Sequence, residues 1–157
     1  METTEMEELY NKIGIIINNI IPEEWNKVYL YAEVSEEHQN VFFYYYPKDN
    51  QNPIYSMDIT DQFNIDDNKF KELRYDLPDC FDELWEEFRI QKQEQWTNLT
   101  FILDNTGEFK INYEYEYPST FGPYAKQVIW AYNTLGIRVG GEMAEDILRT
   151  YLHKDNK

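Results

Sequence analysis

The sequence predicts an α+β fold in which helices pack on an antiparallel sheet of about five strands. First, residues 109–117 alternate apolar and polar side chains without a break, the period of a half-buried strand. Second, three short runs rich in β-branched and aromatic residues, separated by polar turns, lie before residue 60. Third, two amphipathic stretches with helical spacing flank those runs. The expected order is α-β-β-β-α-β-β-α, followed by a C-terminal helical tail.

The first element is a helix predicted over residues 4–20, with Thr3 or Thr4 as its N-cap. Pro22 cannot continue this helix, so we expect a corner over residues 22–25. Apolar side chains at helical spacing mark the side that faces the core: Met6, Leu9, Tyr10, Ile13, Ile16, Ile17 and Ile20.

The strands follow in two antiparallel groups. Polar turns separate the first three, which are predicted over residues 27–34, 41–46 and 54–59. Residues 97–103 and 109–117 form a hairpin, because Asx residues and a glycine over residues 104–107 tolerate positive φ at the turn. We expect the tyrosine side of this hairpin to lie under helices.

A second helix is predicted between the two groups, from Asp66 or Asp67 to about Lys92. Pro78 should kink or split it, since its ring removes a hydrogen bond and crowds the preceding turn. The predicted buried side carries Phe70, Leu73, Leu77, Phe81, Leu84, Trp85 and Phe88. The opposite side carries Asp79, Asp82, Glu83, Glu86 and Glu87.

The C-terminal part is helical. Pro123 suits the first position of a third helix that ends at Leu135, with Gly136 just beyond it. Tyr124, Val128, Tyr132 and Leu135 mark its predicted buried side. A hinge at residues 140–141 leads to a last helix over residues 142–152. We expect one domain over residues 1–137, with the hinge and helical tail over residues 138–157.

Charge is the most unusual bulk property. The chain holds 30 acidic and 14 basic residues, a net charge of −16. Such a surface repels nucleic-acid phosphates and anionic membranes, so we expect no direct binding to either, and a basic protein as partner. Residues 121–157 hold four acidic and five basic residues, so the acidity belongs to the rest of the fold.

Motifs for catalysis or cofactor binding are absent: the chain has no phosphate-binding loop, dinucleotide turn, nucleophile elbow or zinc-helix motif. We expect no cofactor and no enzymatic activity. A single cysteine, Cys80, and the lack of a secretory signal favour the cytoplasm. His38 and His153 fall in a turn and in the tail, where surface roles are expected.

One alternative is a metal-dependent hydrolase that uses carboxylates. Asp58 and Asp61 flank the end of the third predicted strand, and Asp66 and Asp67 are near in sequence. Such a group can hold a hard cation or divide acid and base roles. The competing interpretation is that these residues cap helices or lie solvated in loops, where Asp is favoured.

A resemblance to a known family rests on short segments in a fixed order. Residues 21–25, IPEEW, are followed by Val28-Tyr29 and a strand that ends at Val34. Trp96-Thr97 opens the hairpin, and residues 121–123, FGP, precede a helix that ends at residues 135–137, LGI. Over about residues 6–137 the chain resembles the YezG-like immunity proteins. Residues that carry the resemblance are Pro22, Trp25, Trp96, Phe121, Gly122 and Pro123, and we expect them to have structural roles.

The resemblance implies a non-enzymatic role. Members of this family are antitoxins of bacterial polymorphic toxins that carry an N-terminal LXG delivery domain and a C-terminal nuclease. The expected partner is therefore a basic nuclease toxin, bound and blocked in the producing cell. A general acidic DNA-mimic inhibitor without one cognate toxin is a further alternative, and the oligomeric state stays open.

Two surfaces are candidates for the contact with the toxin. One is the acidic side of the second predicted helix, Asp79, Asp82, Glu83, Glu86 and Glu87. The other is the polar side of the hairpin, Glu114 and Glu116. Both place carboxylates where a basic partner would be attracted.

Overall fold

The computed structural model describes residues 3–116 and 121–155, and they form two compact units, Met1–Tyr117 and Pro118–Lys157. The boundary between them lies before residue 138, where we expected the hinge and helical tail to begin, and the single domain over residues 1–137 stays a prediction.

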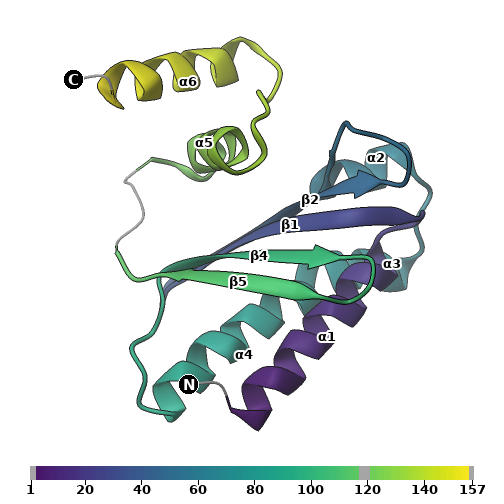
Figure 1. Cartoon of the computed structure of the whole chain (residues 1–157), viewed down its shortest axis with the longest axis vertical. Coiled ribbons are helices and arrows are strands. Elements are labelled where there is room, and N and C mark those ends of the chain that lie inside the picture. The colour runs from purple at the N-terminus through teal and green to yellow at the C-terminus, as the bar shows by residue number, and fades with distance from the viewer. Residues whose placement is uncertain (1–2, 117–120, 156–157) are drawn as a thin grey trace. The chain divides into compact units, whose positions relative to one another are not determined.

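The first unit is built on a five-stranded antiparallel sheet in the order β3-β2-β1-β4-β5 (Figure 1). The strands are β1 (Trp25–Val34), β2 (Gln39–Pro47), β3 (Ile54–Tyr55), β4 (Asn98–Asp104) and β5 (Phe109–Glu114). Strand β1 is central, and it pairs with β2 on one side and β4 on the other. The predicted α+β class is confirmed, and the hairpin β4–β5 forms one side of the sheet.

Strand β3 is much shorter than predicted. The expected strand over residues 54–59 ends at Tyr55, and the chain continues as the 3₁₀ helix η1 (Ser56–Asp58) and the short helix α2 (Ile59–Gln62). The Ser56 hydroxyl accepts a hydrogen bond from the backbone N–H of Phe43 at 3.1 Å, which replaces a bond between strands. Ile59 is then fully buried in the core.

Two helices, α1 (Thr4–Ile20) and α4 (Leu77–Ile90), lie side by side and cover one face of the sheet (Figure 1). The N-cap predicted for α1 is confirmed: Thr3 Oγ1 accepts from the Met6 N–H at 3.2 Å. Apolar residues of both helices form one core with the sheet, including Ile13, Ile17, Val28, Leu30, Phe43, Phe81, Leu84, Trp96 and Phe101.

The second predicted helix exists but is not uniform. It comprises α3 (Asp67–Lys71), a π-helical turn η2 (Glu72–Asp76) and α4. The wider π-helical turn ends directly before Leu77 and Pro78, where the proline ring would crowd the carbonyl one turn back. The helix ends at Ile90 instead of Lys92, since Lys92 has a φ of 59°. Phe70 is 41% exposed, so its predicted burial is wrong.

The hairpin has the predicted turn, but its apolar side is only half covered. Tyr113 packs against the core, whereas Phe109 and Tyr115 are 41% and 43% exposed. Strand β5 ends at Glu114, and Tyr117 of the predicted strand lies outside the described residues.

The second unit contains α5 (Pro123–Leu135) and α6 (Glu142–Asp155). Val128, Ala144 and Leu148 form its small core. Gly136 ends α5 with a φ of 69°, as predicted for a C′ glycine. Tyr124 is 40% exposed, so it does not belong to the buried side that we predicted.

Candidate functional site

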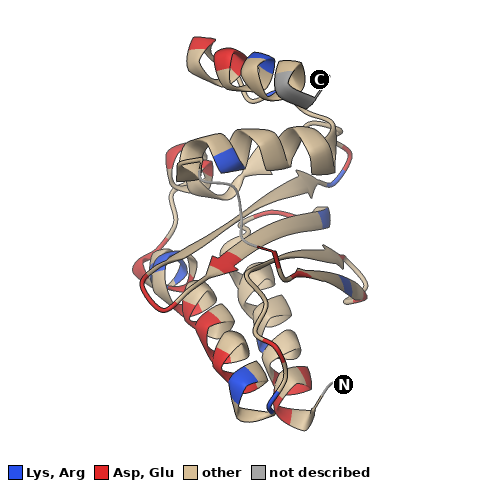
Figure 2. Cartoon of the chain, turned by 90° about the vertical axis from the view of Figure 1, so that its left-hand side faces the viewer, with Lys and Arg blue, Asp and Glu red and all other residues tan. Residues whose placement is uncertain are grey.

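The most prominent charged feature is the acidic side of α4. This helix buries Leu77, Cys80, Phe81, Leu84 and Phe88 in the core. Because the helical period is 3.6 residues, the acidic side chains fall together on the opposite side. Figure 2 shows acidic residues at successive turns along α4 and at the N-terminal end of α1. The structure therefore places all five predicted residues on one face: Asp79, Asp82, Glu83, Glu86 and Glu87.

This acidic surface extends beyond α4 through two shallow hollows. A hollow of about 460 Å³ lies between α1 and α4, and Glu5 and Glu8 line it together with Glu83, Glu86 and Glu87. Its other lining residues are Leu9, Lys12 and Ile90. On the other side of α4, a hollow of about 290 Å³ is lined by Val34, Ser35, Glu36, Asp82, Trp85 and Glu86. Glu86 lines both hollows.

Three acidic residues of this surface, Glu5, Glu8 and Glu36, were missing from the predicted site. Each is exposed and lies on a different element from α4. The sequence contains no local signal for them, because they reach α4 only through the packing of α1 and of the β1–β2 turn. We use the name acidic surface below for Asp79, Asp82, Glu83, Glu86 and Glu87 together with Glu5, Glu8 and Glu36.

Local pairing neutralises only part of this charge. Arg89 pairs with Glu86 at 2.7 Å, whereas Glu87 accepts a hydrogen bond at 2.7 Å from the uncharged Gln91 amide and keeps its charge. Partial burial raises the pKa of Asp82, and the nearby Asp79 charge adds to this, whereas a hydrogen bond with Gln39 opposes it. The ionised form of Asp82 is therefore disfavoured, mainly because its carboxylate is partly buried.

The second predicted surface lies at the open end of the hairpin. Glu114 and Glu116 are both exposed. Their backbone carbonyls are held by Thr97, whose N–H donates to Glu114 O at 2.8 Å and whose hydroxyl donates to Glu116 O. These two glutamates therefore form a second exposed acidic site on the hairpin, separate from the acidic side of α4.

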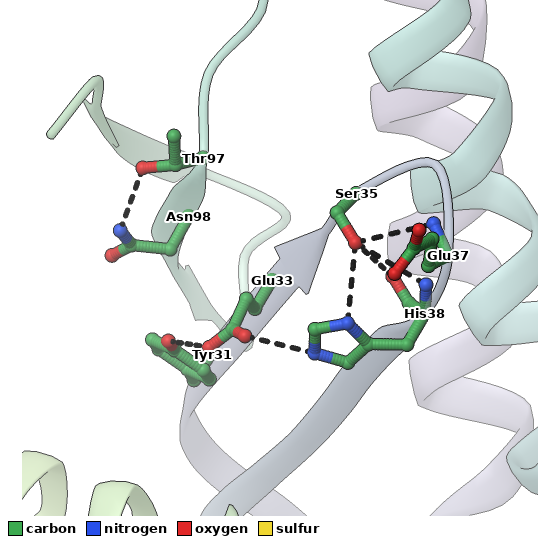
Figure 3. A network of polar contacts seen from close by, with 7 residues as sticks. All are labelled: Tyr31, Glu33, Ser35, Glu37, His38, Thr97 and Asn98. Carbon is green, nitrogen blue, oxygen red and sulfur yellow. Dashed lines mark hydrogen bonds and ion pairs between the residues drawn. The ribbon is translucent and has the colours of Figure 1, made fainter. Parts of the chain in front are cut away.

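A polar network orders the β1–β2 turn, which carries Glu36 (Figure 3). Glu33 is only 3% exposed; it accepts a hydrogen bond from the Tyr31 hydroxyl at 2.6 Å and pairs with His38 Nε2 at 3.1 Å. Burial raises the pKa of Tyr31 above its usual range, and the hydrogen bond with Glu33 adds a smaller effect in the same direction. His38 is indeed mostly exposed, but it has an orienting partner that sequence reasoning missed.

The residues that carry the family resemblance lie at positions that shape the fold. Trp25 donates its indole N–H to Asn18 Oδ1 at 3.1 Å and so fixes the corner after α1. Trp96 is fully buried, and Pro22 is half-buried. Phe121, Gly122 and Pro123 lead into α5, with Gly122 as its N-cap.

The carboxylates of the alternative hydrolase do not form a metal site. Asp66 caps α3, since its side chain accepts from the Lys69 N–H at 2.9 Å. Asp58 and Asp61 are exposed in η1 and α2. Within residues 3–116 and 121–155, no group of three His, Cys, Asp or Glu side chains is arranged to hold a metal ion.

A folded acidic surface favours encounter with a basic partner, because complementary potentials steer association. The family model "Immunity protein YezG-like" matches residues 6–149, which includes part of the C-terminal region that we had excluded from the resemblance. The chain belongs to the YezG-like immunity protein family, and is thus an immunity protein and not an enzyme.

Individual relatives agree with this assignment. The chain is 36% identical to Immunity protein YezG of Bacillus spizizenii, over 97% of this chain and 96% of the relative. It is 40% identical to Immunity protein YezG of Bacillus subtilis, over 94% and 99%. It is 33% identical to Type VII secretion system protein EsaG of Staphylococcus aureus, over 85% and 83%.

No helix in the described part of the chain combines the length and apolar character needed to cross a membrane.

Proposed function

We propose that this immunity protein binds and neutralises a cognate nuclease toxin in the cytoplasm of the producing bacterial cell. The toxin is of the LXG type and carries a basic nuclease domain at its C-terminus. The observation that carries the proposal is the acidic surface, eight carboxylates gathered on α4, α1 and the β1–β2 turn. The name of the staphylococcal relative, a type VII secretion system protein, supports a secreted partner.

The chemistry of a nuclease explains why such a surface suits this role. A protein that cleaves DNA holds phosphates with lysine and arginine side chains, so its binding cleft is basic. A folded acidic surface is complementary to that cleft and needs no nucleic acid of its own. Opposite charges also raise the association rate, which matters when an unbound toxin is lethal.

The proposed contact residues are the acidic side of α4, with Glu114 and Glu116 of the hairpin as a second contact. Ile90, at the end of α4, is 59% exposed and lines the hollow beside Glu83 and Glu87. An exposed apolar residue among carboxylates suits an interface in which an apolar centre has a charged rim. Among the described residues, Lys12 is the one basic side chain that lines this hollow, so an acidic group of the partner would fit there.

The direct test is to isolate the toxin by pull-down from the native cell and to reconstitute its activity. The purified toxin domain should cleave DNA, and one equivalent of this protein should form a 1:1 complex and stop cleavage. An unrelated basic nuclease serves as the control and should stay active. A toxin without nuclease activity would contradict the proposal, and inhibition of both enzymes would favour a general DNA-mimic inhibitor instead.

A further inference from the structure

Strand β5 lies at the edge of the sheet and, in the described part of the chain, pairs with β4 alone (Figure 1). Two backbone hydrogen bonds near β5 show which of its residues direct their N–H and C=O groups towards β4 and which direct them away from the sheet. The Asn105 N–H, directly after β4, donates to Asn26 O, so odd-numbered residues of this strand face β1, and the Asp104 N–H donates to Glu108 O, so even-numbered residues of β4 and β5 face each other. The backbone groups of Phe109 and Ile111 therefore point outward from the sheet.

An edge of this kind is a template for another strand unless the protein protects it. Strand β5 is six residues long and contains no proline, and no β-bulge interrupts its pairing with β4. Phe109, at its start, and Tyr115, directly after its end, are 41% and 43% exposed. The side that we expected to be buried is therefore incompletely covered at both ends of this strand.

The charge pattern of β5 is complementary to itself. Lys110, Asn112 and Glu114 are exposed on the sheet face away from α1 and α4. Neither Lys110 nor Glu114 has an ion-pair partner among the side chains that the structure describes. In an antiparallel pair of two β5 strands centred on Asn112, Lys110 of each copy lies opposite Glu114 of the other.

We propose that two copies of this chain associate through antiparallel pairing of their β5 strands, centred on Asn112. The pairing joins the two five-stranded sheets into one continuous sheet. It also places Phe109 of each copy opposite Tyr115 of the other, and so covers the exposed apolar side chains. The proposal concerns a second copy of this chain and does not depend on the identity or activity of the toxin.

The charges also favour this register over the one centred on Ile111. Pairing centred on Ile111 would place Glu108 opposite Glu114 of the second copy, which brings like charges together at two places. Pairing centred on Asn112 instead forms two Lys–Glu pairs. These pairs occupy non-hydrogen-bonded positions, where opposing side chains are closest.

The dimer is expected to be weak and reversible. A strand pair of this length buries less surface than the roughly 1,600 Å² of a standard interface. Two chains of net charge −16 also repel each other at long range. Salt at about 0.15 M shortens the range of that repulsion to about 8 Å, so association should be measured at or above this ionic strength.

Sedimentation velocity across micromolar to submillimolar concentrations tests the proposal with charge-swap variants. The mass of the wild type should rise from 19.1 kDa towards twice that value. Lys110→Glu and Glu114→Lys should each raise the dissociation constant about tenfold or more, because both ion pairs become like-charge contacts. The double variant Lys110→Glu/Glu114→Lys keeps the net charge of the wild type and should restore association. A monomer at every concentration, or a double variant no better than the singles, would overturn the proposal.

A cysteine at the centre of the pairing tests the register independently. Opposing residues at a non-hydrogen-bonded position have Cα atoms about 4.5 Å apart, which is within the range of a disulfide. Asn112→Cys should therefore form a disulfide-linked dimer rapidly under mild oxidation, and the buried Cys80 does not compete. Asn19→Cys, at an exposed position of α1, is the matched control and should cross-link slowly. Equal rates for the two variants would overturn the proposed pairing.

Discussion

The indole N–H of Trp85 on α4 donates a hydrogen bond to the backbone carbonyl of Trp96, 2.9 Å away. Gln95 Nε2 returns a bond to the Trp85 carbonyl at 3.0 Å. Thr97, the next residue along, holds the carbonyls of Glu114 and Glu116. Residues 95–97 therefore connect the acidic side of α4 to the end of the hairpin that carries the second pair of proposed contact residues.

Replacing Trp85 by Phe tests this connection. The variant removes the N–H donor while it keeps an aromatic ring, and the Trp96 carbonyl loses its bond. We expect the free energy of unfolding of the first unit to fall by about 1 kcal/mol. Urea denaturation followed by circular dichroism measures the change. Tyr75→Phe, at a position that is 60% exposed, is the control and should have almost no effect; equal effects for both variants would show that the Trp85 bond does not stabilise the fold.

Ionisation of Asp82, a residue of the acidic surface, should make the stability of the fold depend on pH. Its pKa is raised in the folded protein, by partial burial and by the charge of Asp79, so ionisation of Asp82 disfavours folding. The stability associated with the protonated group is present below the unfolded pKa of about 3.9 and is lost as pH rises through the folded pKa. Asp82→Asn should therefore raise the melting temperature at neutral pH, and the gain should disappear near pH 3. Thermal melts at both pH values test this, and a gain that is independent of pH would contradict it.

The buried thiol of Cys80 should be unreactive in the folded protein. Burial in the core raises the pKa of Cys80 to about 11, and the thiolate is the reactive form. We expect a disulfide reagent such as DTNB to label Cys80 in the native protein only at the rate at which the fold opens and exposes the thiol. In denaturant, labelling should be prompt. Fast stoichiometric labelling of the native protein would show that the packing around Cys80 is wrong.

Elements defined by local signals were predicted well. Helix α1 begins at a capping threonine and ends before Pro22, and Gly136 ends α5, because each signal acts on its own neighbours. Strand β3 was predicted too long because its end depends on a bond between Ser56 and Phe43, thirteen residues apart in sequence. The central place of β1 likewise depends on strand pairing, which no local pattern contains.

In the candidate site, too, the features set by local sequence could be predicted, and those set by tertiary packing could not. Helical periodicity alone placed five acidic residues on one side of α4, and the structure agrees. Glu5, Glu8 and Glu36 join them only through tertiary packing, and the Glu33–His38 pair depends on the shape of the β1–β2 turn. Which surface the toxin contacts stays a prediction.

The most direct measurement of the central claim is the association rate with the toxin for a charge-reversal variant of α4. The triple variant Glu83→Lys/Glu86→Lys/Glu87→Lys changes the net charge from −16 to −10. The control Asp49→Lys/Asp61→Lys/Glu108→Lys makes the same change at exposed residues of other elements. Stopped-flow kinetics at low salt should show association slowed at least about tenfold for the α4 variant, and much less for the control. Equal rates for the two variants, with cell protection retained in both, would contradict a role for the α4 face in binding the toxin.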